Sequence, residues 1–265
     1  PEWDCSEFVA LKIPRMATND TVDADAFSEF IDEAEIWNDI DDHPRIVTVH
    51  TWGSNPFPWI AVEYMASGDL SEQSLTTDDA FAELEGLCEG LHHAHRHGVT
   101  HSDIKPENIL YTEEEGQPVG KLTDWGLANV LLEHSMSVDG LTPDYSAPEQ
   151  FRPEEFGGTD EQTDIYQLGA VCYKIFTGQP PFSGSTTNVM QKVLTKQVTP
   201  PSEVNTALPS DIDDIVATAL AKEKSERYES VLYLRDHLAD FIDTADETNY
   251  TFSNPNSSPS VAHPD

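Results

Sequence analysis

A polar run near the middle of the chain contains the residue types that transfer of a phosphoryl group requires. Residues 101–108 read His-Ser-Asp-Ile-Lys-Pro-Glu-Asn, and residues 124–126 read Asp-Trp-Gly. Such a transfer needs a carboxylate near the attacking hydroxyl and oxygen ligands that bind magnesium on the phosphates. Asp103 can accept the hydroxyl proton, and Lys105 can neutralise charge on the transferred group. Asn108 and Asp124 supply oxygens that suit magnesium.

These two runs resemble the protein kinase family, whose catalytic loop reads H-R-D-x-K-x-x-N and whose metal motif reads D-F-G. The resemblance extends in order along nearly the whole chain. Lys12, in Val-Ala-Leu-Lys, resembles the strand lysine that binds the α- and β-phosphates of ATP. The resemblance implies a helix glutamate as its partner. Glu33 fits the family's spacing best, and Glu35 is the alternative.

Residues 62–65, Val-Glu-Tyr-Met, resemble the hinge that joins the two lobes of a kinase. The resemblance implies that the backbone of Glu63 and Met65 meets the edge of the adenine ring. It also implies that Ala10 and Leu110 cover the two faces of that ring. We therefore expect ATP to bind between the lobes, with magnesium as the second cofactor.

Further matches follow toward the C-terminus. Residues 147–149, Ala-Pro-Glu, resemble the end of the activation segment, and residues 140–143, Gly-Leu-Thr-Pro, resemble the loop that receives the substrate. The resemblance implies that Glu149 pairs with Arg227. It also implies that Asp164 binds the backbone of the catalytic loop from a helix.

Lys105 stands two residues after Asp103, as in kinases that phosphorylate serine and threonine, and Thr142 agrees with that class. Residues 176–182 are most similar to bacterial-type kinases. The implied function is ATP- and magnesium-dependent phosphorylation of serine or threonine in protein substrates. Two alternatives stay open, a pseudokinase that acts as a binding scaffold and a small-molecule kinase. The Ala-Pro-Glu segment favours a polypeptide substrate over a small molecule.

Three departures from the family pattern affect this prediction. Ser102 stands where the family has an arginine, and no Lys or Arg occurs between Leu122 and Phe151. A phosphate on the activation segment would find no local arginine, so we expect phosphorylation there not to be the ordering switch. Trp125 replaces the phenylalanine of the metal motif. Only 11 residues precede Lys12, so we expect the glycine-rich loop upstream of Pro1 or absent.

Hydrophobic patterns predict the elements that position these residues. Apolar and β-branched runs predict strands at 8–13, 46–51 and 59–64, and helical periodicity begins with a helix over 23–40. Later helices are predicted over 78–97, 162–177, 188–196, 211–221 and 230–242. The predicted fold is α+β and two-lobed like a protein kinase, with a β-rich lobe over 1–64 and a helical lobe over 65–243. Residues 244–265 are rich in Asn, Ser and Pro and predict a disordered tail or linker.

Composition narrows the setting in which the chain works. It has 14 Lys+Arg against 49 Asp+Glu, a net charge of −35 and a pI near 4.2, which argues against binding nucleic acid. Molar salt would screen such a surface, so a salt-loving source is our hypothesis. Three cysteines without a paired pattern suit a reducing cytoplasm, and no stretch is apolar enough to span a membrane. Histidines at 92, 93, 95 and 97 could suggest a metal site. We do not expect one, because no nearby cysteine completes the set of ligands.

Overall fold

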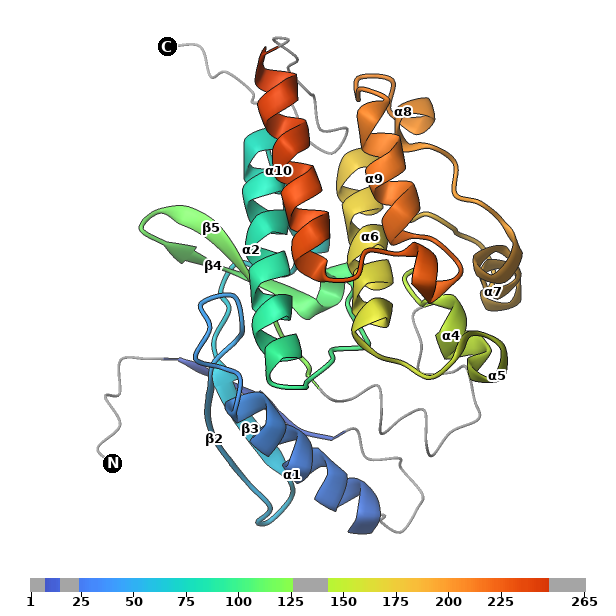
Figure 1. Cartoon of the computed structure of the whole chain (residues 1–265). Coiled ribbons are helices and arrows are strands. Elements are labelled where there is room, and N and C mark those ends of the chain that lie inside the picture. The colour runs from blue at the N-terminus through green and yellow to red at the C-terminus, as the bar shows by residue number, and fades with distance from the viewer. Residues whose placement is uncertain (1–7, 15–23, 126–142, 248–265) are drawn as a thin grey trace.

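A computed structural model describes residues 8–14, 24–125 and 143–247 of the 265-residue chain. Its first part is a small antiparallel sheet with one helix beside it (Figure 1). The strands lie in the order β1-β3-β2, which are β1 (Val9–Lys12), β3 (Trp59–Glu63) and β2 (Val49–Gly53). Helix α1 (Ala24–Asn38) lies between β1 and β2 in the sequence.

Helix α1 packs through the side chains that its periodicity predicts. Phe30, Ala34 and Trp37 are buried, and the indole Nε1 of Trp37 donates a hydrogen bond of 2.8 Å to the carbonyl of Val47. A buried indole N–H needs such a partner. This bond therefore fixes α1 against the chain that leads into β2.

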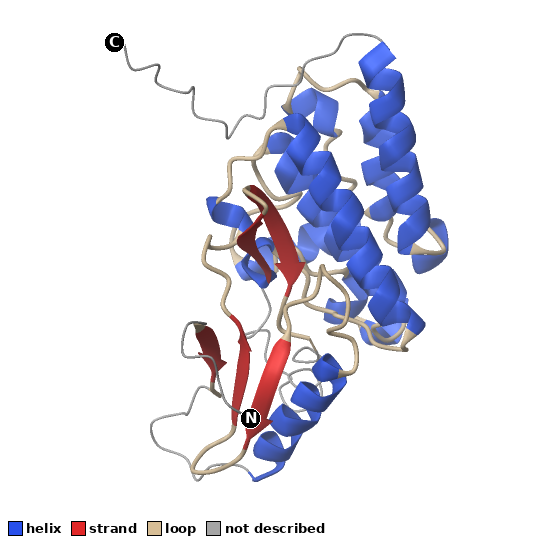
Figure 2. Cartoon of the chain, turned by 90° about the vertical axis from the view of Figure 1, so that its left-hand side faces the viewer, coloured by secondary structure: helices blue, strands red, loops and turns tan. Residues whose placement is uncertain are grey.

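The remainder is mainly helical, with one hairpin (Figure 2). The hairpin strands are β4 (Ile109–Glu114) and β5 (Gln117–Leu122). The α-helices are α2 (Thr77–Arg96), α4 (Pro148–Phe151), α5 (Pro153–Phe156), α6 (Glu161–Thr177), α7 (Thr186–Thr195), α8 (Pro201–Val204), α9 (Asp211–Ala219) and α10 (Val231–Glu247). Short 3-10 helices among the described residues are η1 (Leu70–Glu72), η2 (Pro106–Asn108) and η4 (Lys224–Glu226). A sheet with one helix followed by a helical region agrees with the predicted α+β class.

The long helix α6 has clear signals at both ends. Asp160 caps its N-terminus by accepting a hydrogen bond of 3.0 Å from the N–H of Gln162, and Thr163 completes a capping box. Gly178 ends the helix in the left-handed region, with φ of 78°. Glycine adopts that conformation without steric cost. The caps therefore set where α6 begins and ends, and with it the position of Asp164 in its first turn.

Short backbone contacts join the sheet region to the hairpin. The N–H of Val47 donates to the carbonyl of Leu122 at 2.9 Å, and Ile46 forms an isolated parallel bridge to Leu122. The sequence predicts Ile46 as the start of a strand, but β2 begins only at Val49. The prediction is wrong there because the backbone at Ile46 pairs with β5 instead of with β3.

The C-terminal boundary also differs from the expectation. Helix α10 continues to Glu247, so residues 244–247, predicted as the start of a tail, are helical. Helix α10 packs beside α2, with Phe241 5.8 Å from Phe81 between ring centroids. No helix within the described residues is both long and apolar enough to cross a membrane.

Gly169 marks the closest approach of α6 to α9, and it generates a stability prediction. A Cβ at Gly169 would lie 2.7 Å from the Cβ of Ala219, so Gly169→Ala forces the two helices apart. Overpacking of this kind costs about 1–3 kcal/mol. We expect urea unfolding to show that loss. Gly158→Ala is the control, because a Cβ there meets nothing within 4 Å; equal stability of the two variants would contradict the close approach.

Candidate functional site

Lys12 lies at the end of β1 with two carboxylates within ion-pair distance. Its Nζ is 2.8 Å from Glu33 Oε1 and 3.2 Å from Asp124 Oδ1. Of the two glutamates that the sequence leaves open, Glu33 therefore makes the contact, whereas Glu35 is exposed. The Lys12 ammonium also lies over the Trp37 ring, 5.4 Å from its centroid. The sheet, α1 and the chain after β5 converge on this one cation.

Glu33 is an unusual carboxyl group because it is almost fully buried. Burial raises the pKa of Glu33 from 4.5 to about 7, the nearby Lys12 ammonium opposes this shift, and Asp124 adds to it. Glu33 therefore loses its proton near neutral pH, and only then does its contact with Lys12 become an ion pair. Desolvation outweighs the attraction of a single lysine here.

Asp103, Lys105 and Asn108 form a second cluster in the loop after α2. Lys105 Nζ lies 2.7 Å from Asp103 Oδ2. The Asn108 amide donates to the Asp103 carbonyl at 2.8 Å and to its carboxylate at 3.0 Å. The turn of η2 brings Asn108 back onto Asp103. Because the amide nitrogen of Asn108 points at Asp103, its oxygen is the end that a cation can approach.

The backbone places Asp124 beside this second cluster. The N–H of Thr123, the residue before Asp124, donates to the carbonyl of Asn108 at 3.1 Å. Asp124 itself has φ of 66°, a left-handed conformation that aspartate tolerates better than most residues. Lys12 thus contacts Asp124, the residue before Asp124 bonds to Asn108, and Asn108 bonds to Asp103. Their carboxylate and amide oxygens are the ligand types that magnesium prefers, so the residues fit such an ion.

The predicted adenine-contacting residues are divided between the two lobes. Ala10 pairs with Val62 in the β1–β3 register, and Leu110 lies on β4. The N–H of Glu63 donates to the carbonyl of Thr48 at 2.8 Å. Glu63 could therefore offer a ligand its carbonyl but not its N–H. Ala10 and Met65 are partly buried and pack against the hydrophobic core.

Lys121 on β5 stabilises Glu63, a contact that the sequence does not predict. Its Nζ lies 2.9 Å from Glu63 Oε1 and 2.9 Å from Glu114 Oε1. The other carboxylate oxygen of Glu63 accepts from the N–H of Thr48 at 3.3 Å. The segment predicted as the hinge is therefore tied to the hairpin. A lysine on a short strand carries no sequence signal that would single it out.

Asp164 in the first turn of α6 is fully buried and contacts the start of the catalytic loop. Its carboxylate accepts from the N–H of His101 at 2.9 Å and from the N–H of Ser102 at 2.7 Å. The Nε2 of His95 lies 2.7 Å from the same group. The prediction that a helix aspartate binds this loop is confirmed.

Trp125 fills the space beside the loop histidine. Its ring centroid lies 4.7 Å from that of His101, and its side chain is fully buried. Its indole Nε1 has no hydrogen-bond partner among the described residues. A buried N–H without a partner carries a free-energy cost of about 1–3 kcal/mol. The tryptophan therefore packs as a phenylalanine would, with the indole N–H as an added cost.

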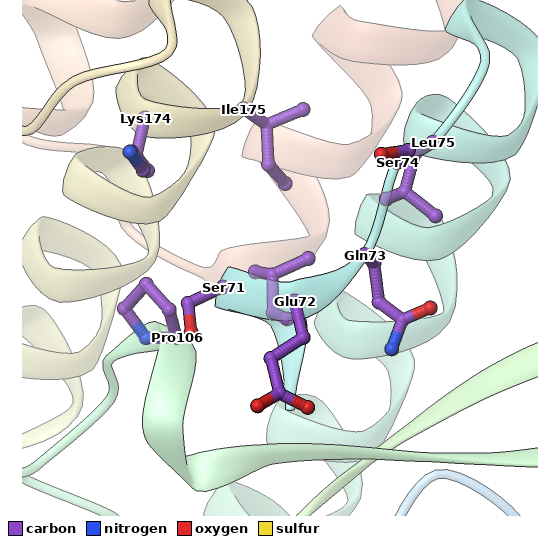
Figure 3. Close-up of a pocket in the computed structure, with 9 residues that line it drawn as sticks. Ser71, Glu72, Gln73, Ser74, Leu75, Pro106, Lys174 and Ile175 are labelled. Carbon is purple, nitrogen blue, oxygen red and sulfur yellow. The ribbon is translucent and has the colours of Figure 1, made fainter. Parts of the chain in front are cut away.

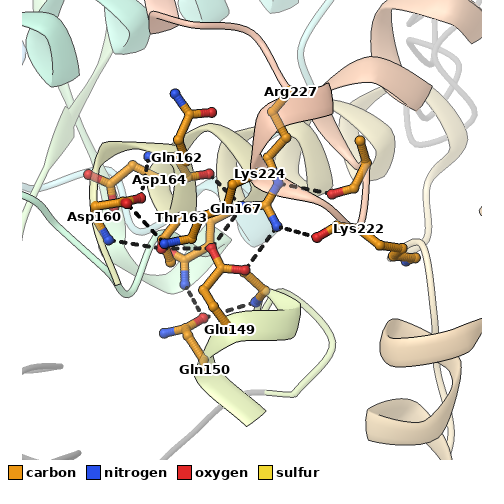
Figure 4. Close-up of polar contacts among 12 residues, drawn as sticks. Glu149, Gln150, Asp160, Gln162, Thr163, Asp164, Gln167, Lys222, Lys224 and Arg227 are labelled. Carbon is orange, nitrogen blue, oxygen red and sulfur yellow. Dashed lines mark hydrogen bonds and ion pairs between the residues drawn. The ribbon is translucent and has the colours of Figure 1, made fainter. Parts of the chain in front are cut away.

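Glu149 and Arg227 form a buried ion pair below the loop, as predicted (Figure 4). Arg227 Nη1 lies 2.7 Å from Glu149 Oε1, and Nη2 lies 2.9 Å from Oε2. The Thr163 hydroxyl donates to Glu149 Oε1 at 2.8 Å. Remaining guanidinium donors bind backbone carbonyls, including those of Ala221 and Gln162. This pair joins α4 to α6 and to the chain before α10.

A pocket of about 220 Å³ lies beside the catalytic loop (Figure 3). Its lining residues are Leu70, Ser71, Glu72, Gln73, Ser74, Leu75, Pro106, Lys174 and Ile175. The amine of Lys174 donates to the carbonyl of Gly178. The pocket is a feature that the sequence does not predict, because it forms where η1, η2 and α6 meet.

Several predicted features lie outside the described residues. They are Gly126, residues 140–142 of the predicted substrate loop, and most of the predicted activation segment. The histidines of α2 are described, and His93 lies 2.9 Å from Asp42 while His95 binds Asp164. Within the described part of the chain, no group of three or more His, Cys, Asp or Glu side chains could hold a metal ion.

Comparisons with known proteins agree with this geometry. Residues 2–238 match the family described as the protein kinase domain. The serine/threonine-protein kinase PknB of Mycobacterium tuberculosis is 32% identical over 212 residues, which cover 74% of this chain and 33% of PknB. The serine/threonine-protein kinase PknJ of Mycobacterium bovis is 31% identical over 233 residues, which cover 83% of this chain and 38% of PknJ. The chain thus spans about a third of the length of these relatives.

A solved structure shows the same fold. The crystal structure of the Mycobacterium tuberculosis PknI kinase domain matches with a TM-score of 0.64 and 24% sequence identity. The match covers 83% of this chain and 80% of that domain. The two-lobed fold predicted from the sequence is therefore confirmed.

The buried ion pair generates a prediction for stability. Arg227→Met leaves Glu149 as a buried carboxylate without its cation, and breaking such a pair costs about 3–5 kcal/mol. Urea unfolding should show this loss. Arg152→Met removes an exposed arginine that pairs with Glu155, and such pairs contribute about 0–1 kcal/mol. Similar losses in the two variants would contradict the assigned role of Arg227.

Glu33 generates a prediction for pH dependence. The folded chain binds the Glu33 proton more tightly than the unfolded chain, so the contribution of this carboxyl to stability falls as pH rises from 4.5 to about 7. The shift corresponds to about 3 kcal/mol. The Glu33→Gln variant lacks this carboxyl and does not undergo the loss. Its free energy of unfolding, relative to that of wild type, should therefore rise by about 3 kcal/mol between about pH 5 and about pH 8.

Urea unfolding at both pH values measures this difference. Glu35→Gln is the control, since Glu35 lies on the same helix but is exposed. Its stability relative to wild type should change little with pH. A pH-independent difference for Glu33→Gln would contradict the raised pKa.

Proposed function

The chain belongs to the protein kinase family, and from this premise we propose that it transfers the γ-phosphoryl group of ATP to serine or threonine in protein substrates. The observation that carries the proposal is that Lys12 contacts Asp124, that Thr123 beside Asp124 bonds to Asn108, and that Asn108 bonds to Asp103. These contacts join a phosphate-binding type of cation, metal-binding types of oxygen and a carboxylate base. A structural ion-pair network alone would not need this combination.

We propose that Asp103 accepts the proton of the substrate hydroxyl. Lys105, in contact with Asp103, then lies where it can neutralise charge on the transferred phosphoryl group. Asn108 orients the Asp103 carboxylate through its amide nitrogen. In this assignment the loop supplies the base, the charge-neutralising cation and the residue that orients the base.

Lys12 would bind the α- and β-phosphates, with Glu33 keeping its ammonium in position. The Lys12 ammonium lies close to Asp124. Phosphate oxygens of ATP would compete with Asp124 for this ammonium. The carbonyl of Glu63 and the backbone of Met65 would meet adenine, and Ala10 and Leu110 would cover its faces.

Asn108 and Asp124 would bind magnesium through their side-chain oxygens. A magnesium ion on the phosphates neutralises their charge and orients the transferred group. The left-handed backbone at Asp124 and the bond from Thr123 to Asn108 keep the two residues adjacent.

Serine or threonine as the acceptor is supported by Lys105 at two residues after Asp103 and by relatives that are serine/threonine-protein kinases. We further propose that the domain works in a reducing compartment. Cys88 and Cys172 are buried free thiols among the described residues, which is consistent with a cytoplasmic setting. A salt-loving source is a hypothesis that rests on composition alone.

A scaffold without catalysis is the second candidate. Ser102 in place of the family's arginine is the observation that favours it, because the usual partner of an activating phosphate is missing. Retention of Lys12, Asp103, Asn108 and Asp124 favours the enzyme.

Phosphate transfer from radiolabelled ATP to a general protein substrate tests the proposal. Asp103→Asn should lower kcat by about 10²–10⁴-fold, the usual range for a lost general base, with little effect on folding. Asp211→Asn is the control, because Asp211 is an exposed aspartate of α9.

Assays in dilute buffer and in molar potassium chloride also test the salt hypothesis. Nucleotide binding by folded wild-type protein without transfer would instead indicate the scaffold.

A further inference from the structure

The backbone of Ser102 is the conformationally costly point of the catalytic loop. Its φ is 59°, in the left-handed region that residues other than glycine rarely adopt. Such a conformation persists only where surrounding contacts stabilise it. Asp103 follows directly, so the direction of its carboxylate depends on how Ser102 is held. The contacts of the Ser102 peptide groups therefore bear on the proposed base.

Gln167 of α6 contacts the backbone on both sides of Asp103. Its Oε1 accepts from the N–H of Ile104 at 2.8 Å, and its Nε2 donates to the carbonyl of Ser102 at 3.0 Å. A backbone N–H can only donate and a carbonyl can only accept, so these partners fix the orientation of the amide. One buried side chain therefore spans the residue that carries the base.

Gln150 of α4 adds a second neutral contact to the same carbonyl. Its Nε2 donates to Ser102 O at 2.8 Å. Its Oε1 accepts from the N–H of Ala147 at 2.9 Å and from Gln167 Nε2 at 2.9 Å. The start of α4, which the resemblance places at the end of the activation segment, is thereby joined to the catalytic loop. Figure 4 shows the two glutamines between α4 and α6.

We propose that Gln167, supported by Gln150, is a positioning residue that fixes the Ser102–Asp103–Ile104 backbone in the arrangement needed for phosphoryl transfer. The inference rests on the proposed function, because it assigns Asp103 as the base. Both glutamines are neutral and buried, so they need neither a phosphate nor an arginine to order the loop. In this chain they order the loop, whereas Ser102 supplies no positive charge of the kind that the family's arginine has at that position.

The amide of Gln167 differs from an apolar filler in being both donor and acceptor. Gln167→Met keeps the size of the side chain but removes both hydrogen bonds. Gln167→Glu keeps the acceptor for Ile104 but places a second acceptor against the carbonyl of Ser102. Protonation of the introduced carboxyl restores a donor. The charged or ionisable groups in the adjoining hydrogen-bond network are Asp164, His95, His101, Asp103 and the Glu149–Arg227 pair, all of which are present in wild type as well.

Steady-state kinetics with ATP and a protein substrate test the proposal. Gln167→Met should lower kcat by about 10- to 100-fold with KM for ATP nearly unchanged, because the base is displaced while the nucleotide residues remain in place. The kcat of Gln167→Glu, divided by that of wild type at the same pH, should rise as pH falls. Gln162→Met is the matched control, since Gln162 lies on the same helix and its side chain does not contact the loop.

The pH ratio separates positioning from simple loss of stability. A ratio that does not change with pH, or wild-type kcat in Gln167→Met, would overturn the proposal. The proposal would also be overturned if Gln162→Met lost as much kcat and thermal stability as Gln167→Met. The effect would then not depend on contact with the loop.

Hydrogen exchange makes the test independent of transfer activity. Peptides that contain residues 101–104 should exchange at least about tenfold faster in Gln167→Met than in wild type, while peptides from α2 exchange as before. This result with inactive wild-type protein would support the positioning contact and reject the proposed function. Unchanged exchange would reject the positioning contact, whatever the activity of wild type.

Discussion

The buried carboxylate of Asp164 is the constraint on which the rest of the site depends. It accepts two backbone N–H groups from His101 and Ser102 and contacts His95, so its charge is compensated by three donors. A buried carboxylate without such donors would carry a large desolvation cost. These hydrogen bonds require the loop to lie against the N-terminal end of α6. The cap at Asp160 fixes where that helix starts. The fold of the larger lobe thus determines the path of the backbone that leads to Asp103.

Among the described residues, ion pairs help to position the smaller lobe. Lys12 is shared between Glu33 of α1 and Asp124 of the chain after β5. Backbone contact between Val47 and Leu122 and the ion pair of Lys121 with Glu63 add two further connections. Because burial raises the pKa of Glu33 to about 7, the electrostatics of the contact between the sheet region and α1 change with pH near neutrality.

The candidate site residues could be proposed from the sequence because each is a charged or polar type at a fixed spacing within a motif. The sequence left Glu33 and Glu35 open, and the structure distinguishes them, because Glu33 is buried beside Phe30, Ala34 and Trp37 of α1 and contacts Lys12. The start of β2 could not be predicted, since Ile46 is equally apolar whether it pairs with β3 or with β5. Gln150 and Gln167 could not be predicted either. A neutral amide has no periodic or charge signal, and its role depends on which backbone groups the fold brings to it.

Acidic composition gives the neutral contacts a particular advantage. With 14 Lys+Arg against 49 Asp+Glu, each cation has many competing carboxylates, and contacts between exposed charges weaken as salt screens them. Arg227 escapes this competition because its pair with Glu149 is buried. The amides of Gln150 and Gln167 escape it as well, since buried hydrogen bonds between neutral groups do not depend on a Debye length. Ordering the catalytic loop through amides and one buried carboxylate therefore makes its geometry less dependent on salt than contacts between exposed charges are.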